Sequence, residues 1–94
     1  MLPIKRYRTA RITCEIPLEL QLLLWDCVEQ LREGADCLQV FELTSNEGKQ
    51  QIVHFQEVPR FQKEYWIFSN RPIVAKIYII IEGEYATMLF ADEY

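Results

Sequence analysis

The sequence predicts an α+β fold in which one α-helix in the N-terminal half packs on a mostly antiparallel sheet of five to six strands. One segment, residues 17–33, is rich in Leu, Glu and Gln, which favour a helix. The remainder consists of short runs of β-branched and aromatic residues separated by turn-forming residues. The chain has 94 residues, half of them hydrophobic, so residues 1–94 are expected to form a single domain around one core.

The first strand is expected at residues 6–15, where Tyr, Thr and Ile alternate loosely with basic residues. Pro17 suits the first turn of a helix, where its missing N–H needs no partner. The helix is therefore expected over residues 17–33, ending at Gly34, a residue type common just after helix C-termini.

Five further strands are expected, joined by short turns that favour antiparallel pairing. They are placed at residues 37–44, 50–58, 63–68, 73–82 and 85–91. The segment 73–82 is the clearest, because Ile and Ala side chains alternate along one of its faces. Gly83 then allows a tight turn into the last strand. A helix laid across one face of such a sheet is typical of the α+β class.

Charge and cysteine content favour a cytoplasmic protein. Residues 1–14 carry four basic and no acidic side chains, whereas the other 80 carry six basic and fourteen acidic ones, so the net charges of +4 and −8 give −4 overall. No apolar run approaches the roughly 20 residues of a membrane-spanning helix, and no secretion signal is recognised. The spacing of Cys14, Cys27 and Cys37 matches no zinc or redox motif. We therefore expect reduced cysteines, no metal, no cofactor and no membrane partner.

Catalysis is not expected. His54 is the only histidine, and a lone histidine in a strand is more often a hydrogen-bonded structural side chain than a general base. Cys27 falls on the apolar side of the expected helix, where a thiol is inert. The sequence contains no glycine-rich phosphate loop and no H-E-x-x-H or G-x-S-x-G motif.

The expected helix is apolar on two sides. Its broad face, which we expect to pack on the sheet, contains Leu20, Leu23, Leu24, Cys27, Val28 and Leu31. Leu18, Leu22 and Trp25 lie on the opposite side, where a helix that covers a sheet is normally polar. Two explanations remain open. Either the N-terminal arm Leu2–Ile4 or a loop covers these side chains, or a second copy or another protein binds there.

The sheet offers a second candidate surface, on the face turned away from the helix. Lys76 and Tyr78 alternate with the apolar face of strand 73–82 and are expected to point outward. One of Tyr65 and Trp66 is expected to join them, although the sequence does not decide which. An open sheet face needs either a polar surface or a partner.

A basic strip near the N-terminus supports an alternative function. It comprises Lys5, Arg6, Tyr7, Arg8 and Arg11. On a strand, Lys5, Tyr7 and Arg11 share one face and Arg6 and Arg8 the other. Such residues suit weak binding of nucleic acid, by phosphate contacts and base stacking. The competing interpretation is that they protect an edge strand and pair with the acidic body.

Two segments resemble a known family. They are Glu15–Trp25 (EIPLELQLLLW), preceded by Arg6–Thr9 (RYRT), and the C-terminal Thr87–Tyr94 (TMLFADEY). Both resemble short single-domain proteins of low-GC Gram-positive bacteria that form a domain-of-unknown-function family. The resemblance implies a bacterial, intracellular protein and brings no activity, cofactor or catalytic residue with it.

Together these observations predict a small, non-enzymatic protein-interaction module, in the form of a homodimer or a complex with another protein. Its candidate surfaces are Leu18, Leu22 and Trp25 on the helix and Lys76 and Tyr78 on the sheet. The alternative is a weak nucleic-acid-binding accessory protein that uses the basic strip.

Overall fold

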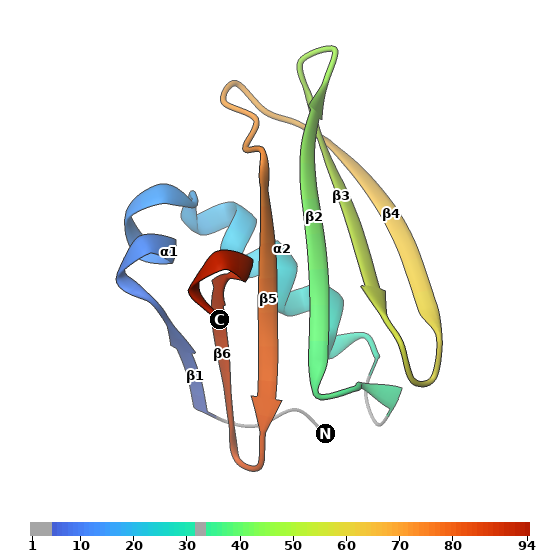
Figure 1. Cartoon of the computed structure of the whole chain (residues 1–94). Coiled ribbons are helices and arrows are strands. Elements are labelled where there is room, and N and C mark those ends of the chain that lie inside the picture. The colour runs from blue at the N-terminus through green and yellow to red at the C-terminus, as the bar shows by residue number, and fades with distance from the viewer. Residues whose placement is uncertain (1–4, 32–33) are drawn as a thin grey trace.

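The computed structural model describes residues 5–31 and 34–94. Its elements form two layers, a six-stranded sheet and a pair of helices (Figure 1). The helices are α1 (Ala10–Glu15) and α2 (Leu18–Glu29). The strands are β1 (Lys5–Arg8), β2 (Leu38–Asn46), β3 (Lys49–Gln56), β4 (Phe61–Phe68), β5 (Ala75–Glu82) and β6 (Tyr85–Phe90), followed by the short 3₁₀ turn η2 (Ala91–Glu93). This arrangement confirms the predicted α+β class.

The sheet order is β1-β6-β5-β2-β3-β4. Four of the five strand pairs are antiparallel, and only β1 pairs with its neighbour β6 in parallel. The prediction of a mostly antiparallel sheet is therefore confirmed. β1 and β4 form the two edges, and α2 crosses behind the central strands β5 and β2 (Figure 1).

The predicted strand over residues 6–15 is wrong in its second half. Extended backbone ends at Arg8, and Ala10–Glu15 form the helix α1. Thr9 caps this helix, since its side-chain oxygen accepts a hydrogen bond from the Ile12 N–H at 3.3 Å. The cap satisfies one of the N–H groups that a helix start leaves unpaired, so the segment turns helical despite its β-branched residues.

The long predicted helix is present but shorter than expected. α2 begins at Leu18, directly after Pro17, and ends at Glu29, with Gln30 as its C-cap. The predicted continuation as far as residue 33 is wrong for residues 30 and 31, and residues 32–33 lie outside the described part of the chain. The arm Leu2–Ile4, one of the proposed covers for the outer side of the helix, also lies outside the described residues.

The five later strands match the predicted ones, with ends shifted by one or two residues. The predicted loop over residues 45–49 is tighter than expected, because Asn46 pairs with Lys49 across a two-residue turn. Glu47 and Gly48 both have positive φ in this turn, as the twist of a β-hairpin favours. Gly83, with φ +57°, begins the corresponding turn between β5 and β6, as predicted.

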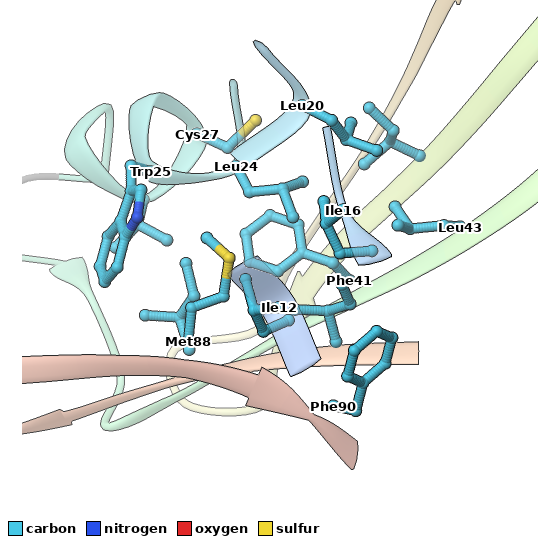
Figure 2. Packing of buried hydrophobic residues seen from close by; sticks show 14 of the residues in the cluster. Ile12, Ile16, Leu20, Leu24, Trp25, Cys27, Phe41, Leu43, Met88 and Phe90 are labelled. Atoms are coloured by element: carbon cyan, nitrogen blue, oxygen red, sulfur yellow. The ribbon is translucent and has the colours of Figure 1, made fainter. Parts of the chain in front are cut away.

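The core lies between the helices and one face of the sheet. Leu24 and Val28 of α2 and Ile12 of α1 are fully buried, and Figure 2 shows Leu24 and Ile12 converging on the ring of Phe41. Alternate strand residues that face the helices complete the cluster: Phe41, Leu43, Ile52, Ile77, Ile79, Ala86, Met88 and Phe90. Because alternate residues of a strand point to opposite faces, this composition leaves the other face of the sheet outside the core.

The C-terminus is held against α1. The Glu93 carboxylate accepts hydrogen bonds from the Phe90 N–H and from the Thr9 hydroxyl, both at 2.9 Å. The Arg11 guanidinium pairs with Asp92 at 2.6 Å. Thr9 therefore links the start of α1 to the end of the chain.

Removal of the Thr9 cap should lower the stability of the protein measurably. Thr9→Ala removes the cap and the bond to Glu93, and we expect it to lower the free energy of unfolding by about 1 kcal/mol. Urea unfolding followed by circular dichroism measures the change. Thr13→Ala is the matched control, because Thr13 is exposed in the same helix. Equal losses in the two variants would show that the cap is not what stabilises α1.

Candidate functional site

The candidate residues from the helix and from the basic strip meet in one place. A groove of about 350 Å³ runs between β1 and the first half of α2. This β1–α2 groove is lined by Arg6, Tyr7, Arg8, Leu18, Gln21, Leu22 and Trp25. All of these except Gln21 belong to the two candidate sets that the sequence indicated separately. The fold thus places apolar and basic side chains beside each other.

Gln21, which the sequence analysis missed, holds the groove together. Its side chain is 3% exposed. The amide nitrogen donates to the carbonyls of Ile12 and Ile16 at the end of α1, at 3.3 and 2.7 Å. The amide oxygen accepts from the Arg8 guanidinium at 2.7 Å. Gln21 thereby joins β1, α1 and α2, because each of its polar atoms bonds a different part of the chain.

Of the three residues expected on the outer side of the helix, Leu18 and Leu22 are exposed, whereas Trp25 is covered by the chain itself, one of the two explanations that the sequence left open. The two leucines are 57% and 58% exposed, but Trp25 is 7% exposed. The Arg6 guanidinium covers the Trp25 ring, 5.0 Å from its centroid. Trp25 is buried because β1 extends the sheet beyond β6 and covers this flank of α2. Part of the outer helix side is therefore covered by the chain itself.

The basic strip does not form one surface. Lys5 and Tyr7 point to the open side of the sheet and Arg6 and Arg8 to the helix side, as expected for a strand. Arg11 was expected beside Lys5 and Tyr7, but this is wrong because it belongs to α1. Acidic side chains pair with two of the five residues of the basic strip. Glu29 pairs with Arg6, and Glu15 and Asp92 pair with Arg11.

The open face of the sheet carries an apolar belt made of two adjacent rows of side chains. The strand registers define both rows. One row is Phe55, Val40, Tyr78 and Leu89, and the other is Leu38, Ile80, Thr87 and Tyr7. Together they cross five strands, and the Tyr78 ring packs edge-on against Tyr94 at 5.9 Å. Both α-helices lie on the opposite side of the sheet, and the C-terminal Tyr94, directly after η2, reaches this face.

Lys76 and Tyr78 both lie on this open face, as predicted. Lys76 stands opposite Glu42 in the β2–β5 pair, next to the apolar belt. The register of β3 and β4 decides between the two neighbouring aromatic residues. Tyr65 stands beside the buried Ile52 and faces the helices, whereas Trp66 faces outward and is 45% exposed.

His54 belongs to a buried network of glutamines and is fully buried rather than half-buried. Its Nε2 atom lies 2.8 Å from the Gln39 Oε1 atom. Gln39 donates to Gln56 at 2.7 Å, and Gln56 donates to the carbonyls of Gly34 and Pro59, each at 2.8 Å. Because both glutamine nitrogens are committed to carbonyl acceptors, Gln39 presents an oxygen to His54. The Nε2 atom must therefore carry the proton.

This environment keeps His54 neutral. The ring stacks on Phe41 at 4.4 Å and meets Phe61 edge-on at 5.3 Å, and its Nδ1 atom has no partner in the described residues. Burial lowers the pKa of His54 from 6.5 to about 4, since the charged form would lie in an apolar site. No described cysteine or carboxylate bonds to the ring, and its hydrogen-bond partner is the Gln39 amide.

The buried thiol likewise has a structural partner. A hydrogen bond joins Cys27 to the Tyr65 hydroxyl. Burial raises the pKa of the Cys27 thiol, and burial also raises the pKa of Tyr65 to about 12. Both groups therefore stay protonated at neutral pH. The described residues contain no cluster of potential metal ligands, and none of the described helices is long and apolar enough to cross a membrane.

The family of the chain follows from its match to a family model. Residues 5–93 match the model described as "Staphylococcal protein of unknown function (DUF960)". The chain belongs to this family. The match covers nearly the whole sequence and confirms the resemblance to short proteins of low-GC Gram-positive bacteria.

A solved structure supports the same assignment at the level of fold. The chain is similar to a crystal structure of a protein of unknown function from Enterococcus faecalis, with a TM-score of 0.80 and 21% identity. The similarity covers 96% of this chain and 90% of that one. Comparison with curated proteins gives no match. The chain therefore shares its fold with this Enterococcus faecalis protein, and function must be argued from the surfaces.

Because His54 is buried in its neutral form, the free energy of unfolding should depend on pH. The unfolded chain takes up a proton at His54 near pH 6.5, whereas the folded chain does so only near pH 4. Between these values the unfolded state binds more protons, so the free energy of unfolding falls as pH falls, by up to about 1.4 kcal/mol per pH unit. Denaturant unfolding at a series of pH values measures this slope. His54→Leu should flatten it in that window, and an unchanged slope in the variant would assign the dependence to other groups.

Proposed function

We propose that the protein is a non-enzymatic interaction module of the bacterial cytoplasm that associates through the open face of its sheet, first of all with a second copy of itself. The observation that carries this proposal is the apolar belt. When another face covers a sheet face with two rows of aliphatic and aromatic side chains, the removal of this apolar surface from water makes association favourable. Within the described chain Val40 and Leu89 are already buried by their neighbours and Tyr94 packs on Tyr78, whereas the other belt residues remain partly or largely exposed.

The charge distribution favours a partner that is itself acidic overall, such as a second copy. The strand residues that point outward include three lysines and three glutamates. They are Lys5, Lys49, Lys76, Glu42, Glu64 and Glu82. Their charges cancel, although the chain carries −4 in total. Two open faces therefore meet without the like-charge repulsion that the rest of the surface would impose.

The dimensions of the face support association as well. The molecule measures 37 × 28 × 21 Å, and the two-layer architecture makes the shortest axis the one across the layers. The rectangle bounded by the two longer axes, about 1,000 Å², is an upper bound on the projected area of the open face, and it exceeds the roughly 800 Å² per partner that a standard interface buries. Packing of two sheets face to face is also a common solution for apolar strand faces.

Two other predicted surfaces are less well supported. Leu18 and Leu22 are exposed on α2, but the burial of Trp25 leaves them as a pair of side chains rather than a stripe. The nucleic-acid alternative loses support because the basic strip is divided among three surfaces. Lys5 and Tyr7 lie on the open face, Arg6 and Arg8 on the helix side, and Arg11 on α1. Arg6 and Arg11 are also already paired with carboxylates.

Sedimentation equilibrium over a range of concentrations tests the proposal. The molar mass should rise with concentration from 11.2 kDa toward twice that value. Tyr78→Glu, at the centre of the belt, should weaken the association more than about tenfold, because it buries an unpaired charge. Lys76→Glu should act in the same direction, since it replaces a balancing charge at an exposed position.

Leu22→Glu is the matched control, because it places the same side chain at an exposed site on the helix layer. It should leave the association unchanged. Thermal melts followed by circular dichroism identify any variant that has simply lost its fold. A wild-type protein that remains a monomer at every concentration, or an association that Leu22→Glu abolishes and Lys76→Glu does not, contradicts self-association through the open face.

A further inference from the structure

The β1–α2 groove lies next to the outer edge of β1, with which no other described strand pairs. The N–H groups of Lys5 and Thr9 donate to the carbonyls of Glu84 and Met88 in β6, at 3.4 and 3.2 Å. Backbone groups of alternate residues in a strand point to opposite sides. The N–H and C=O groups of Arg6 and Arg8 are therefore directed away from β6, toward the outer edge of the sheet. Such an edge accepts a further strand.

One guanidinium at this edge has no acidic partner among residues 5–31 and 34–94. Arg6 pairs with Glu29 at 2.9 Å and covers Trp25. Arg8 instead bonds only the neutral amide oxygen of Gln21 among the described residues. A carboxylate that approaches Arg8 along the groove would gain a charge-assisted hydrogen bond, since a guanidinium has five N–H donors.

The floor of the groove is apolar immediately beside this charge. Leu18 and Leu22 are one helical turn apart and more than half exposed. A strand added to β1 would direct every second side chain to this side of the sheet. A carboxylate over Arg8 and an aliphatic side chain two positions away would thus fit the basic and the apolar part of the groove.

A second copy of the chain does not satisfy this edge. Two β1 strands related by a two-fold axis pair in antiparallel fashion. Any register that joins the outward backbone groups of Arg6 and Arg8 places an arginine opposite an arginine on the helix side. Like charges directly opposite each other are destabilising. A nucleic acid offers charge for Arg8 but has no peptide groups to pair with the strand.

We propose that the edge of β1 and the β1–α2 groove bind an extended acidic segment of another protein. The backbone of the segment adds a seventh strand in register with Arg6 and Arg8, its carboxylate bonds Arg8, and its aliphatic side chain covers Leu18 and Leu22. This mode combines main-chain pairing for affinity with side-chain pockets for specificity. The groove lies on the helix side, so the inference is independent of association through the open face.

Trp25 provides a local signal for the test. The chain has two tryptophans, and the other, Trp66, lies on β4 at the far edge of the sheet. In a Trp66→Phe background the fluorescence comes from Trp25 alone. The probe is a short blocked peptide in which glutamate and leucine alternate with threonine. We expect a saturable change in Trp25 emission on titration with this peptide.

Two variants locate the binding. Arg8→Gln should weaken the affinity about tenfold, the usual order for loss of a charge-assisted hydrogen bond. Arg60→Gln removes the same charge at the turn between β3 and β4, far from β1, and should leave the affinity within about twofold, because exposed distant charges are screened. A peptide that is N-methylated at every residue should not bind, because neither of its edges keeps an N–H group to donate to the strand.

Several results would overturn the inference. They are the absence of a fluorescence change, equal effects of Arg8→Gln and Arg60→Gln, and full binding of the N-methylated peptide. Stronger binding of the same peptide with lysine in place of glutamate would contradict the charge argument. A Trp25 response to a thymidine oligonucleotide but not to the acidic peptide would assign the groove to nucleic acid instead.

Discussion

The packing of both helices on the same face of the sheet is the constraint on which the rest of the structure depends. Only Thr9 separates β1 from α1, and only two residues separate α1 from α2. With connections this short, the helices pack on the face that Ile12 and Leu24 seal against Phe41. No α-helix lies between Leu38 and Phe90, and only the short η2 and Tyr94 follow, so no described α-helix covers the other face. The open face is thus a consequence of the connectivity.

Buried polar side chains hold the two ends of this arrangement in place. At one end Gln21 ties α2 to the last carbonyls of α1 and to Arg8. At the other end Gln39 and Gln56 connect β2 and β3 to the backbone of the loops around them. Buried amides are stabilising only when all their groups are bonded. These networks therefore specify one geometry, and they also fix the position of the β1–α2 groove.

The sequence predicts the parts of this fold that local chemistry decides. Alternating isoleucines reveal β5, and Gly48 and Gly83 reveal the hairpin turns, because each signal lies within a few residues. It does not predict what depends on distant parts of the chain. The parallel pairing of β1 with β6 joins the first and last strands, and this pairing buries Trp25, which a helical wheel places outside. The α1 helix was missed for a different reason: its cap, Thr9, lies within a segment that otherwise resembles a strand.

The central claim is that the functional surface is the face that the helices leave uncovered. Paramagnetic relaxation from a soluble gadolinium chelate measures this directly in NMR spectra of a sample with labelled methyl groups. At low protein concentration the methyl groups of the partly buried Ile80 and the exposed Leu22 should both show enhanced relaxation, with the larger effect at Leu22. As concentration rises, the enhancement at Ile80 should fall while that at Leu22 stays constant. If the enhancement at Ile80 does not change with concentration, the open face is not an interface between copies and the account is wrong.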